Sequence, residues 1–336
     1  MSLDPDRINS PHYRDGRYRN IDPDDAIADK HFGSVLYWKL FGEVDPPAPG
    51  SGPGDDQPPE TTQLSRADLL ADPGQVRIVW LGHSTVWIAS NRNGERFHLI
   101  CDPVFDTILS QSRMTPLPIA ITARDLPPVH AIAVSHPHLD HMDFDSLRTL
   151  QELNPDAALY VPSGTRAFAE DEELRNLRIL EWWESEAFAA AGANRIHYLP
   201  AHHWSRMGVN DMMQSHWLSF AFEIDGRLIY FAGDTGFSSH FQKIAARFPS
   251  GFDAALMPIG AFKPRWFMKH AHIDPQQAYE ASRLLKVRKI LPVHWGTFGL
   301  GDDRPREPAS FLRKVLDDAG ESDRGYIWQP GGHFDL

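Results

Sequence analysis

Apolar residues along this chain fall into short runs separated by turn residues, the pattern expected of strands buried in a sheet. The runs predicted to be strands cover residues 76–81, 85–89, 97–100, 130–134, 158–161, 179–183, 195–199, 218–224, 228–232, 254–257, 289–293 and 325–328. Helical patterns cover residues 143–153, 164–171, 238–248, 274–286 and 308–318. Because hairpins come first and strands then alternate with helices, the sequence predicts an α/β (α+β) fold with mixed sheets flanked by helices.

The N-terminal region differs from this pattern. Residues 45–60 are rich in Pro and Gly, so residues 1–60 are predicted to form an extension ending in a linker or poorly ordered loop, and residues 61–336 the catalytic domain. Within the extension, residues 32–41 place apolar side chains around much of a helical circumference. We favour packing of this segment on the main domain; a membrane-interface or homodimer contact is the alternative.

Composition narrows the classes of function. The net charge of −12 disfavours nucleic acid as the main partner. The single cysteine, Cys101, excludes both an internal disulfide framework and a cysteine-based zinc site. No stretch approaches the ~20 apolar residues of a membrane span, and the chain begins without a signal-peptide pattern. We therefore expect a soluble, cytoplasmic protein, with peripheral membrane contact left open.

The densest group of metal-binding side chains follows the strand at 130–134, where residues 135–141 read Ser-His-Pro-His-Leu-Asp-His. His136 and His138 are two residues apart, so in an extended segment they point the same way and can close on one ion. Asp140 and His141 can aim at a second position. Imidazole and carboxylate suit zinc, with Mn or Fe as competitors. A solvated polar loop is the alternative, but four metal-binding side chains at one strand end favour a metal site.

Two ions need more ligands than this loop supplies. His203, Asp234 and His294 each terminate an apolar strand, which brings the candidate set to seven. Asp234 is the natural bridging carboxylate because Gly233 and Gly236 let the backbone approach closely. The set predicts a dinuclear hydrolytic centre.

The order of these residues resembles the metallo-β-lactamase superfamily, whose mark is a His-x-His-x-Asp-His run followed by His, Asp and His ligands. The runs at 82–86, 102–105, 231–236, 256–268, 272–275 and 294–298 are similar to the N-acyl-phosphatidylethanolamine phospholipase D family. The resemblance covers the chain from about Val76 onward. It implies a four-layer αββα sandwich, two zinc ions and hydrolysis of a phospholipid, releasing N-acylethanolamine and phosphatidic acid.

The resemblance also implies roles. It assigns one metal to His136, His138 and His203, the other to Asp140, His141 and His294, and the bridge to Asp234. The resemblance also implies that His272 acts on the substrate; a structural role for His272 is the alternative. Independently of the resemblance, a two-metal mechanism would let Asp140 orient the attacking water as well as bind metal. His202 precedes His203, so these two could be confused as the ligand, and Trp204 favours His203.

Further candidates surround this set. His83 and Asp102 lie at strand ends and are predicted to orient ligands or backbone. Arg265 is a candidate for substrate phosphate, with a surface ion pair as the equal alternative. Trp266 and Phe267 are candidates for an acyl chain or membrane if exposed, and for the core if buried.

Three functions remain in competition. The first is a zinc phosphodiesterase of phospholipase D type. The second is a metal-dependent hydrolase of another ester, such as a lactone or a cyclic phosphate, because the same seven ligands serve both. The third, a metal-binding scaffold, requires coordination that is fully closed to water, and the predicted open strand ends disfavour it.

Overall fold

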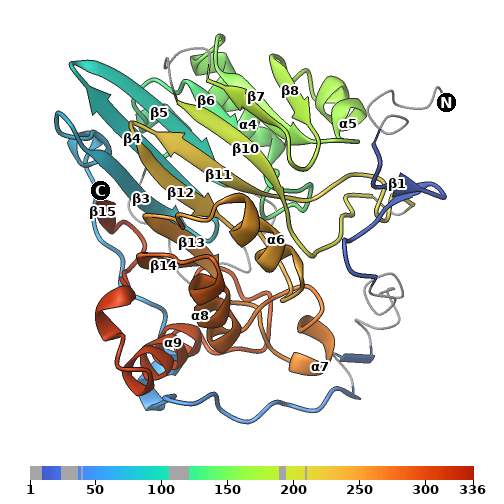
Figure 1. The fold of residues 1–336 in the computed structure, drawn as a ribbon, viewed down its shortest axis with the longest axis vertical. Coiled ribbons are helices and arrows are strands. Elements are labelled where there is room, and N and C mark those ends of the chain that lie inside the picture. The colour runs from blue at the N-terminus through green and yellow to red at the C-terminus, as the bar shows by residue number, and fades with distance from the viewer. Residues whose placement is uncertain (1–9, 24–36, 39–40, 106–120, 189–193, 209) are drawn as a thin grey trace.

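Two mixed β-sheets face each other in the computed structural model of this chain (Figure 1). The structure describes residues 10–23, 37–38, 41–105, 121–188, 194–208 and 210–336. Most of the segment at 32–41 lies outside these ranges, as do residues 106–120.

The first sheet has seven strands in the order β15-β3-β4-β5-β6-β7-β8. These are β3 (Val76–Gly82), β4 (Thr85–Arg92), β5 (Glu95–Cys101), β6 (Ala131–Ala133), β7 (Ala158–Pro162), β8 (Leu177–Leu180) and β15 (His333–Asp335). Pairing is antiparallel from β15 to β5 and parallel from β5 to β8.

The second sheet has six strands in the order β14-β13-β12-β11-β10-β9. These are β9 (Ser185–Ala187), β10 (Arg195–Pro200), β11 (Leu218–Ile224), β12 (Arg227–Phe231), β13 (Ala254–Pro258) and β14 (Lys289–Val293). The parallel strands β13 and β14 are almost wholly buried, as expected of strands covered on both faces.

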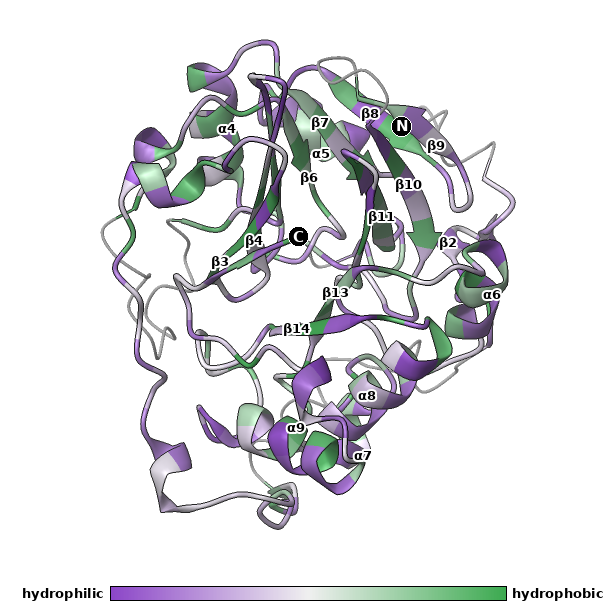
Figure 2. Cartoon of the chain, turned by 60° about the vertical axis from the view of Figure 1, so that its left-hand side comes forward, coloured by the Kyte–Doolittle hydropathy of each residue, from purple (hydrophilic) through white to green (hydrophobic). Residues whose placement is uncertain are grey.

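Helices cover the outer face of each sheet. They are α4 (Phe144–Leu153), α5 (Arg166–Asp171), α6 (His240–Arg247), α8 (Pro275–Leu284) and α9 (Glu307–Asp318), while the short helix α7 (Arg265–Met268) follows β13 in the chain. Leu147 of α4 packs with Val79 and Leu81, whereas Ile78 and Trp80 face the second sheet, so β3 is buried on both sides. Figure 2 shows α4 outside the first sheet, and α8 and α9 on the far side of β13 and β14. The predicted fold class and its four αββα layers are confirmed.

Local sequence explains where the main helices begin. Asp143 accepts a hydrogen bond from the backbone N–H of Ser146 at the start of α4. Asp274 caps α8 in the same way, and Pro275 occupies its first position. These two helices therefore begin where the sequence predicts.

Two predicted strands are wrong in extent. Residues 325–328 run beside β14 but form only a bridge between Gly325 and Ile290, because Pro292 of β14 has no N–H to continue the ladder. The last strand is instead β15. Residues 179–183 do not form one strand, because the chain leaves the first sheet after Leu180 and enters the second at Ser185.

The N-terminal region packs on this frame. A hairpin of β1 (Tyr13–Arg14) and β2 (Arg17–Tyr18), which the sequence did not predict, buries Tyr18 completely. Within the expected linker, Asp55 accepts a hydrogen bond from Ser310 of α9 at 2.7 Å, and the N–H of Ala48 donates to Glu307 at 2.7 Å. Residues 45–60 are thus packed against α9. The division into an extension and a catalytic domain stays a prediction.

Within the described ranges, no helix combines the length and the apolar character needed to cross a membrane.

Candidate metal centre

All seven candidate ligands lie at strand ends that meet on one edge of the two sheets. The loop after β6 carries His136, His138, Asp140 and His141, while His203, Asp234 and His294 follow β10, β12 and β14. The backbone is closely packed here. A Cβ on Gly233 would lie 2.9 Å from Cβ of Ser135, and one on Gly260 would lie 1.9 Å from the carbonyl oxygen of His294. Glycine at these two positions therefore lets the strand ends approach each other.

One group of side chains comprises His136, His138 and His203, each offering a ligand atom within 4.8 Å of the others. Nε2 of His203 lies 3.3 Å from Nδ1 of His138. His202, the alternative to His203, is not part of any such group among the described residues. The geometry thus favours His203 as the candidate ligand.

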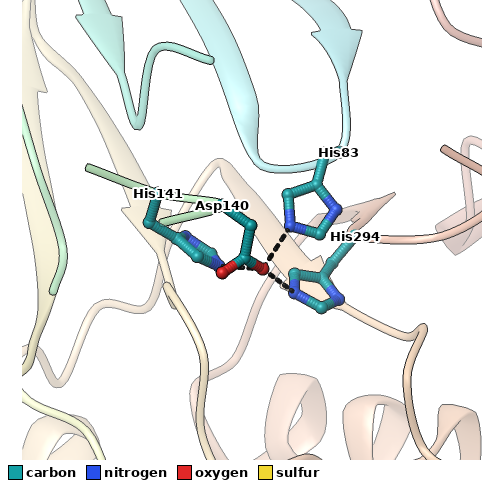
Figure 3. Close-up of side chains that lie close together, drawn as sticks. All are labelled: His83, Asp140, His141 and His294. Atoms are coloured by element: carbon teal, nitrogen blue, oxygen red, sulfur yellow. Dashed lines mark hydrogen bonds and ion pairs between the residues drawn. The ribbon is translucent and has the colours of Figure 1, made fainter. Parts of the chain in front are cut away.

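A second group comprises Asp140, His141 and His294, joined by His83 (Figure 3). Oδ2 of Asp140 lies 3.4 Å from Nε2 of His141 and 3.9 Å from Nε2 of His294. His83 hydrogen-bonds the same oxygen at 2.9 Å. His83 therefore holds the carboxylate that the sequence expected it to orient.

Asp234 lies between the two groups. Its Oδ2 is 4.0 Å from Nε2 of both His136 and His203 and 3.3 Å from Nε2 of His141, and its Oδ1 is 3.1 Å from Nε2 of His294. Each carboxylate oxygen can thus serve a different group. This is the arrangement that a carboxylate bridging two ions requires.

The electrostatics of the centre suit cations. Burial alone would raise the pKa of Asp234, but the charges of His294 and His141 lower it well below its usual value. Burial also lowers the pKa of His136 and His203 well below normal, which keeps these rings neutral, the form that binds metal.

The rings of His141 and His294 behave differently. Burial lowers the pKa of His141, but the carboxylate of Asp234, followed by those of Asp140 and Asp102, outweighs it and raises the pKa well above normal. Asp234 likewise raises the pKa of His294 against burial. The field that attracts a proton to these rings would equally attract a metal cation.

Whether these residues could hold metal ions can be judged from buried donor atoms that have no hydrogen-bond partner. Within the described part of the chain, Nε2 of His136, His141 and His294 and Oδ1 of Asp234 make no hydrogen bond. Atoms bound to one tetrahedral zinc at about 2.1 Å lie about 3.4 Å apart. The observed separations of 3.1–4.0 Å bracket this value, so the residues fit metal ions of the kind their donor atoms suggest.

The opposite ring nitrogens are held by fixed partners, which aims Nε2 at the centre. Nδ1 of His141 bonds to Asp102 at 2.7 Å, Nδ1 of His136 to the hydroxyl of Ser135 at 2.9 Å, and Nδ1 of His203 to the carbonyl of Ala271 at 3.0 Å. Asp102 also accepts bonds from the backbone N–H and the hydroxyl of Ser135, both at 2.7 Å. Asp102 thus fixes a strand end together with a candidate ligand.

Sequence reasoning missed one residue of this support. The side-chain amide of Asn20 donates to the carbonyl of His203 at 2.9 Å and accepts from its N–H at 3.1 Å. No local signal could have identified Asn20, because it lies 183 residues from His203 in a segment of irregular composition.

His272 lies beside the same centre, at the turn between α7 and α8. Its Nδ1 is 3.8 Å from Oδ2 of Asp234, and its ring centroid is 5.3 Å from that of His203. The structure therefore brings His272 next to the seven candidate ligands.

Protein acceptors surround the guanidinium of Arg265, which favours the ion pair over phosphate binding, the two alternatives that the sequence left equal. Its Nη1 donates to the carbonyl oxygens of Phe262 and His272 at 3.3 and 3.0 Å, and its Nη2 donates to Gln277 at 3.0 Å. Its Nε lies 3.5 Å from Asp274. The guanidinium is committed to protein acceptors and ties the His272 turn to the start of α8.

The two aromatic candidates differ in exposure. Trp266 is 41% exposed and meets Tyr37 edge-on, with ring centroids 5.9 Å apart. Phe267 is half-buried and stacks on the buried Trp38 at 5.2 Å. Trp266 thus faces solvent, whereas Phe267 fastens α7 to the N-terminal region.

Comparisons with known proteins agree with this geometry. A model described as "Beta-lactamase superfamily domain" matches residues 98–295. The chain is 34% identical over 272 residues to N-acyl-phosphatidylethanolamine-hydrolyzing phospholipase D 1 of Caenorhabditis elegans, covering 74% of each chain. It is also 34% identical over 263 residues to the mitochondrial N-acyl-phosphatidylethanolamine-hydrolyzing phospholipase D of Saccharomyces cerevisiae, covering 75% of this chain and 54% of that protein.

Solved structures share the fold. Igni18, a metallo hydrolase from Ignicoccus hospitalis, superposes with a TM-score of 0.60 at 22% identity, covering 78% of this chain and 98% of its own. An isothiocyanate hydrolase from Delia radicum gut bacteria gives a TM-score of 0.59 at 18% identity, covering 77% and 98%. At these identities the likeness concerns the fold alone.

Proposed function

This chain belongs to the beta-lactamase superfamily and to the family of the N-acyl-phosphatidylethanolamine-hydrolyzing phospholipases D, and from that premise we propose that it hydrolyses the phosphodiester bond of an N-acylated phosphatidylethanolamine. The products would be N-acylethanolamine and phosphatidic acid. The chain is a metal-dependent hydrolase by its relatives, and the choice of substrate is our proposal.

The position of Asp234 between the two groups of candidate ligands carries the hydrolytic part of this proposal. The 34% identity to two N-acyl-phosphatidylethanolamine-hydrolyzing phospholipases D supports the choice of substrate. His136, His138 and His203 would hold one zinc ion, and Asp140, His141 and His294 the other, with Asp234 shared. Two such ions lower the pKa of a bound water and neutralise charge on phosphoryl oxygens. Mn or Fe would suit the same nitrogen and oxygen donors.

The protein's own groups then position the reactants. Asp140 is held by His83 and can orient the attacking water through its carboxylate. The water oxygen bonds to phosphorus while the bond from phosphorus to the ethanolamine oxygen breaks. The leaving oxygen requires a proton. His272, beside Asp234 at 3.8 Å, is placed to supply it or to polarise a phosphoryl oxygen.

A lipid substrate requires access to a membrane surface, and one exposed aromatic cluster supports this. Tyr37 is 57% exposed, Phe41 71% and Trp266 41%, and the ring centroids of Tyr37 and Phe41 lie 6.0 Å apart. Trp266 belongs to α7, which leads directly to His272. Exposed aromatic residues suit the interfacial layer of a bilayer. Peripheral membrane contact here is part of the proposal, and homodimer formation stays a prediction.

The proposal is tested with purified, zinc-loaded protein and vesicles containing N-acylated phosphatidylethanolamine in ¹⁸O-labelled water. We expect phosphatidic acid carrying one ¹⁸O and unlabelled N-acylethanolamine, measured by mass spectrometry. Asp234→Asn should abolish turnover, whereas Asp225→Asn, at a hairpin turn, should leave it intact.

Two results would count against the proposal. Intact lipid together with rapid hydrolysis of a lactone or a cyclic phosphate would move the chain to the competing ester hydrolases. Label in the N-acylethanolamine would show cleavage at carbon rather than at phosphorus. Circular dichroism of Asp234→Asn separates loss of activity from loss of fold.

A further inference from the structure

A cavity of about 500 Å³ lies where the N-terminal hairpin, the turn after β8 and α6 come together. Its lining includes residues from all three: Arg14, Arg19 and Asn20 from the hairpin region, Trp183 from the turn, and Lys243 from α6. None of the seven candidate metal ligands lines it. It is thus separate from the metal centre.

The charged residues that line this cavity are basic. Arg14, Arg19 and Lys243 line it, and no Asp or Glu is among the lining residues that the structure describes. In the same ranges Arg14 and Lys243 form no ion pair, and Arg19 has only a 3.9 Å contact with Asp15, whose side chain is 90% exposed. In a chain of net charge −12, three cations without strong partners are concentrated at one cavity.

Two carboxylates close in sequence to lining residues form hydrogen bonds with serines. Asp22 accepts bonds from the backbone N–H and the hydroxyl of Ser239, both at 2.7 Å. Glu181 accepts from the hydroxyl of Ser10 at 2.8 Å. Asp22 keeps its charge and interacts electrostatically with Lys243. The cations of the lining are nevertheless felt by His12 on the cavity wall, whose pKa is lowered first by burial and then by Arg14 and Lys243.

The rest of the lining is apolar. Ile21, Trp183 and Met213 contribute to it, and Met213 is buried. A fully hydrated inorganic ion would leave this apolar part of the lining exposed to water. A ligand with an apolar body and one acidic group would cover the apolar wall and place its charge among the cations.

We propose that this cavity binds a small organic anion, a compact apolar body carrying one acidic group, at a site distinct from the metal centre. Asn20 forms part of its wall and holds the backbone of His203. A bound anion would therefore contact the residue that joins the N-terminal hairpin to the metal centre.

The test uses the zinc-loaded full chain and naphthalene-2-sulfonate, because a sulfonate is a weak ligand for zinc. Isothermal titration calorimetry should show one saturable site per chain, weakened by added salt because exposed charges are screened. The double variant Arg14→Gln/Lys243→Gln removes two of the three cations that line the cavity. We therefore expect it to bind the sulfonate at least about tenfold more weakly, a loss that is only a small part of the binding free energy. The matched pair Arg92→Gln/Arg96→Gln, exposed at the β4–β5 hairpin, should bind normally.

Two further measurements separate this cavity from other binding. Neutral 2-naphthol should bind at least about tenfold more weakly than the sulfonate if the charge matters. Asp234→Asn should leave sulfonate binding unchanged, because the cavity does not include the metal centre. Absence of saturable binding, equal affinity in Arg14→Gln/Lys243→Gln, or equal affinity for 2-naphthol would each overturn the proposal. Arg19→Gln gives an independent single substitution should the double variant be unstable.

Discussion

The side chain of Asn20 forms two hydrogen bonds with the backbone of His203, donating to its carbonyl at 2.9 Å and accepting from its N–H at 3.1 Å. The same amide oxygen accepts from the indole N–H of Trp217 at 2.9 Å. The N-terminal hairpin is thereby attached to the strand end that carries a candidate metal ligand.

Replacing this amide should loosen the metal centre. We expect Asn20→Ala to weaken zinc affinity about tenfold, because outer partners of metal ligands typically contribute this much. Chelator competition measures the affinity directly. The control is Asn194→Ala, which removes a comparable buried bond to the backbone N–H of Asp225 far from the centre. An equal loss of zinc affinity in both variants would indicate a general loss of stability instead.

Asp102 should matter more, because it holds a ligand ring directly. It accepts from Nδ1 of His141 and from two groups of Ser135. Asp102→Asn is expected to reduce zinc affinity about 10- to 100-fold. Asp253→Asn, which alters an acceptor of the N–H of Leu228 at 2.9 Å, serves as the control. Zinc content measured after dialysis should fall in the first variant only.

Arg265 should behave as a positioning residue for His272. Removing its bond to the carbonyl of His272 in Arg265→Gln should lower kcat severalfold while leaving KM nearly unchanged, because the guanidinium is bonded to protein acceptors around the His272 turn. Steady-state kinetics on lipid vesicles separates the two parameters. Arg283→Gln, at an exposed ion pair of α8, is the control. A large rise in KM with unchanged kcat would restore the phosphate-binding role expected from sequence.

The exposed aromatic cluster should govern membrane association. We expect Phe41→Glu/Trp266→Glu to reduce co-sedimentation with anionic vesicles severalfold, because two carboxylates would enter the headgroup layer in place of two rings. Tyr326→Glu is a matched control, since Tyr326 is also 41% exposed but lies on a different part of the chain. Equal binding by all three proteins would place the membrane contact elsewhere.

A buried histidine should make stability depend on pH. Burial lowers the pKa of His240 to about 3, so its ring is neutral in the folded protein and protonates below about pH 6.5 only after unfolding. Its contribution to stability is therefore present above pH 6.5 and is lost as pH falls toward 3.

The variant His240→Gln removes this titration. Between pH 7 and pH 5 the wild type should lose about 2 kcal/mol of unfolding free energy relative to the variant, as a pKa difference of this size requires. Urea unfolding of the metal-free proteins at both pH values measures the difference. A constant gap between the two proteins would show that His240 does not titrate on unfolding.

Sequence alone located most of the strands and helices and supplied the candidate ligands. Strand positions follow from apolar runs, and the starts of α4 and α8 follow from Asp143 and Asp274 as capping residues. Both signals act over a few residues, so they can be recognised without knowledge of the fold. The loop at 135–141 is equally local, because its four metal-binding side chains are close in sequence.

Tertiary structure decided the relationships between distant segments. Only the packed sheets show His203 rather than His202 at the centre, Arg265 committed to the His272 turn, and Asn20 beneath His203. Tertiary structure also limits the pairing of residues 325–328 with β14 to a single bridge beside Pro292, where the sequence predicts a strand. The physical reason is that periodicity and capping are short-range properties of the chain, whereas the partners of a side chain are fixed by which strand ends the buried core brings together.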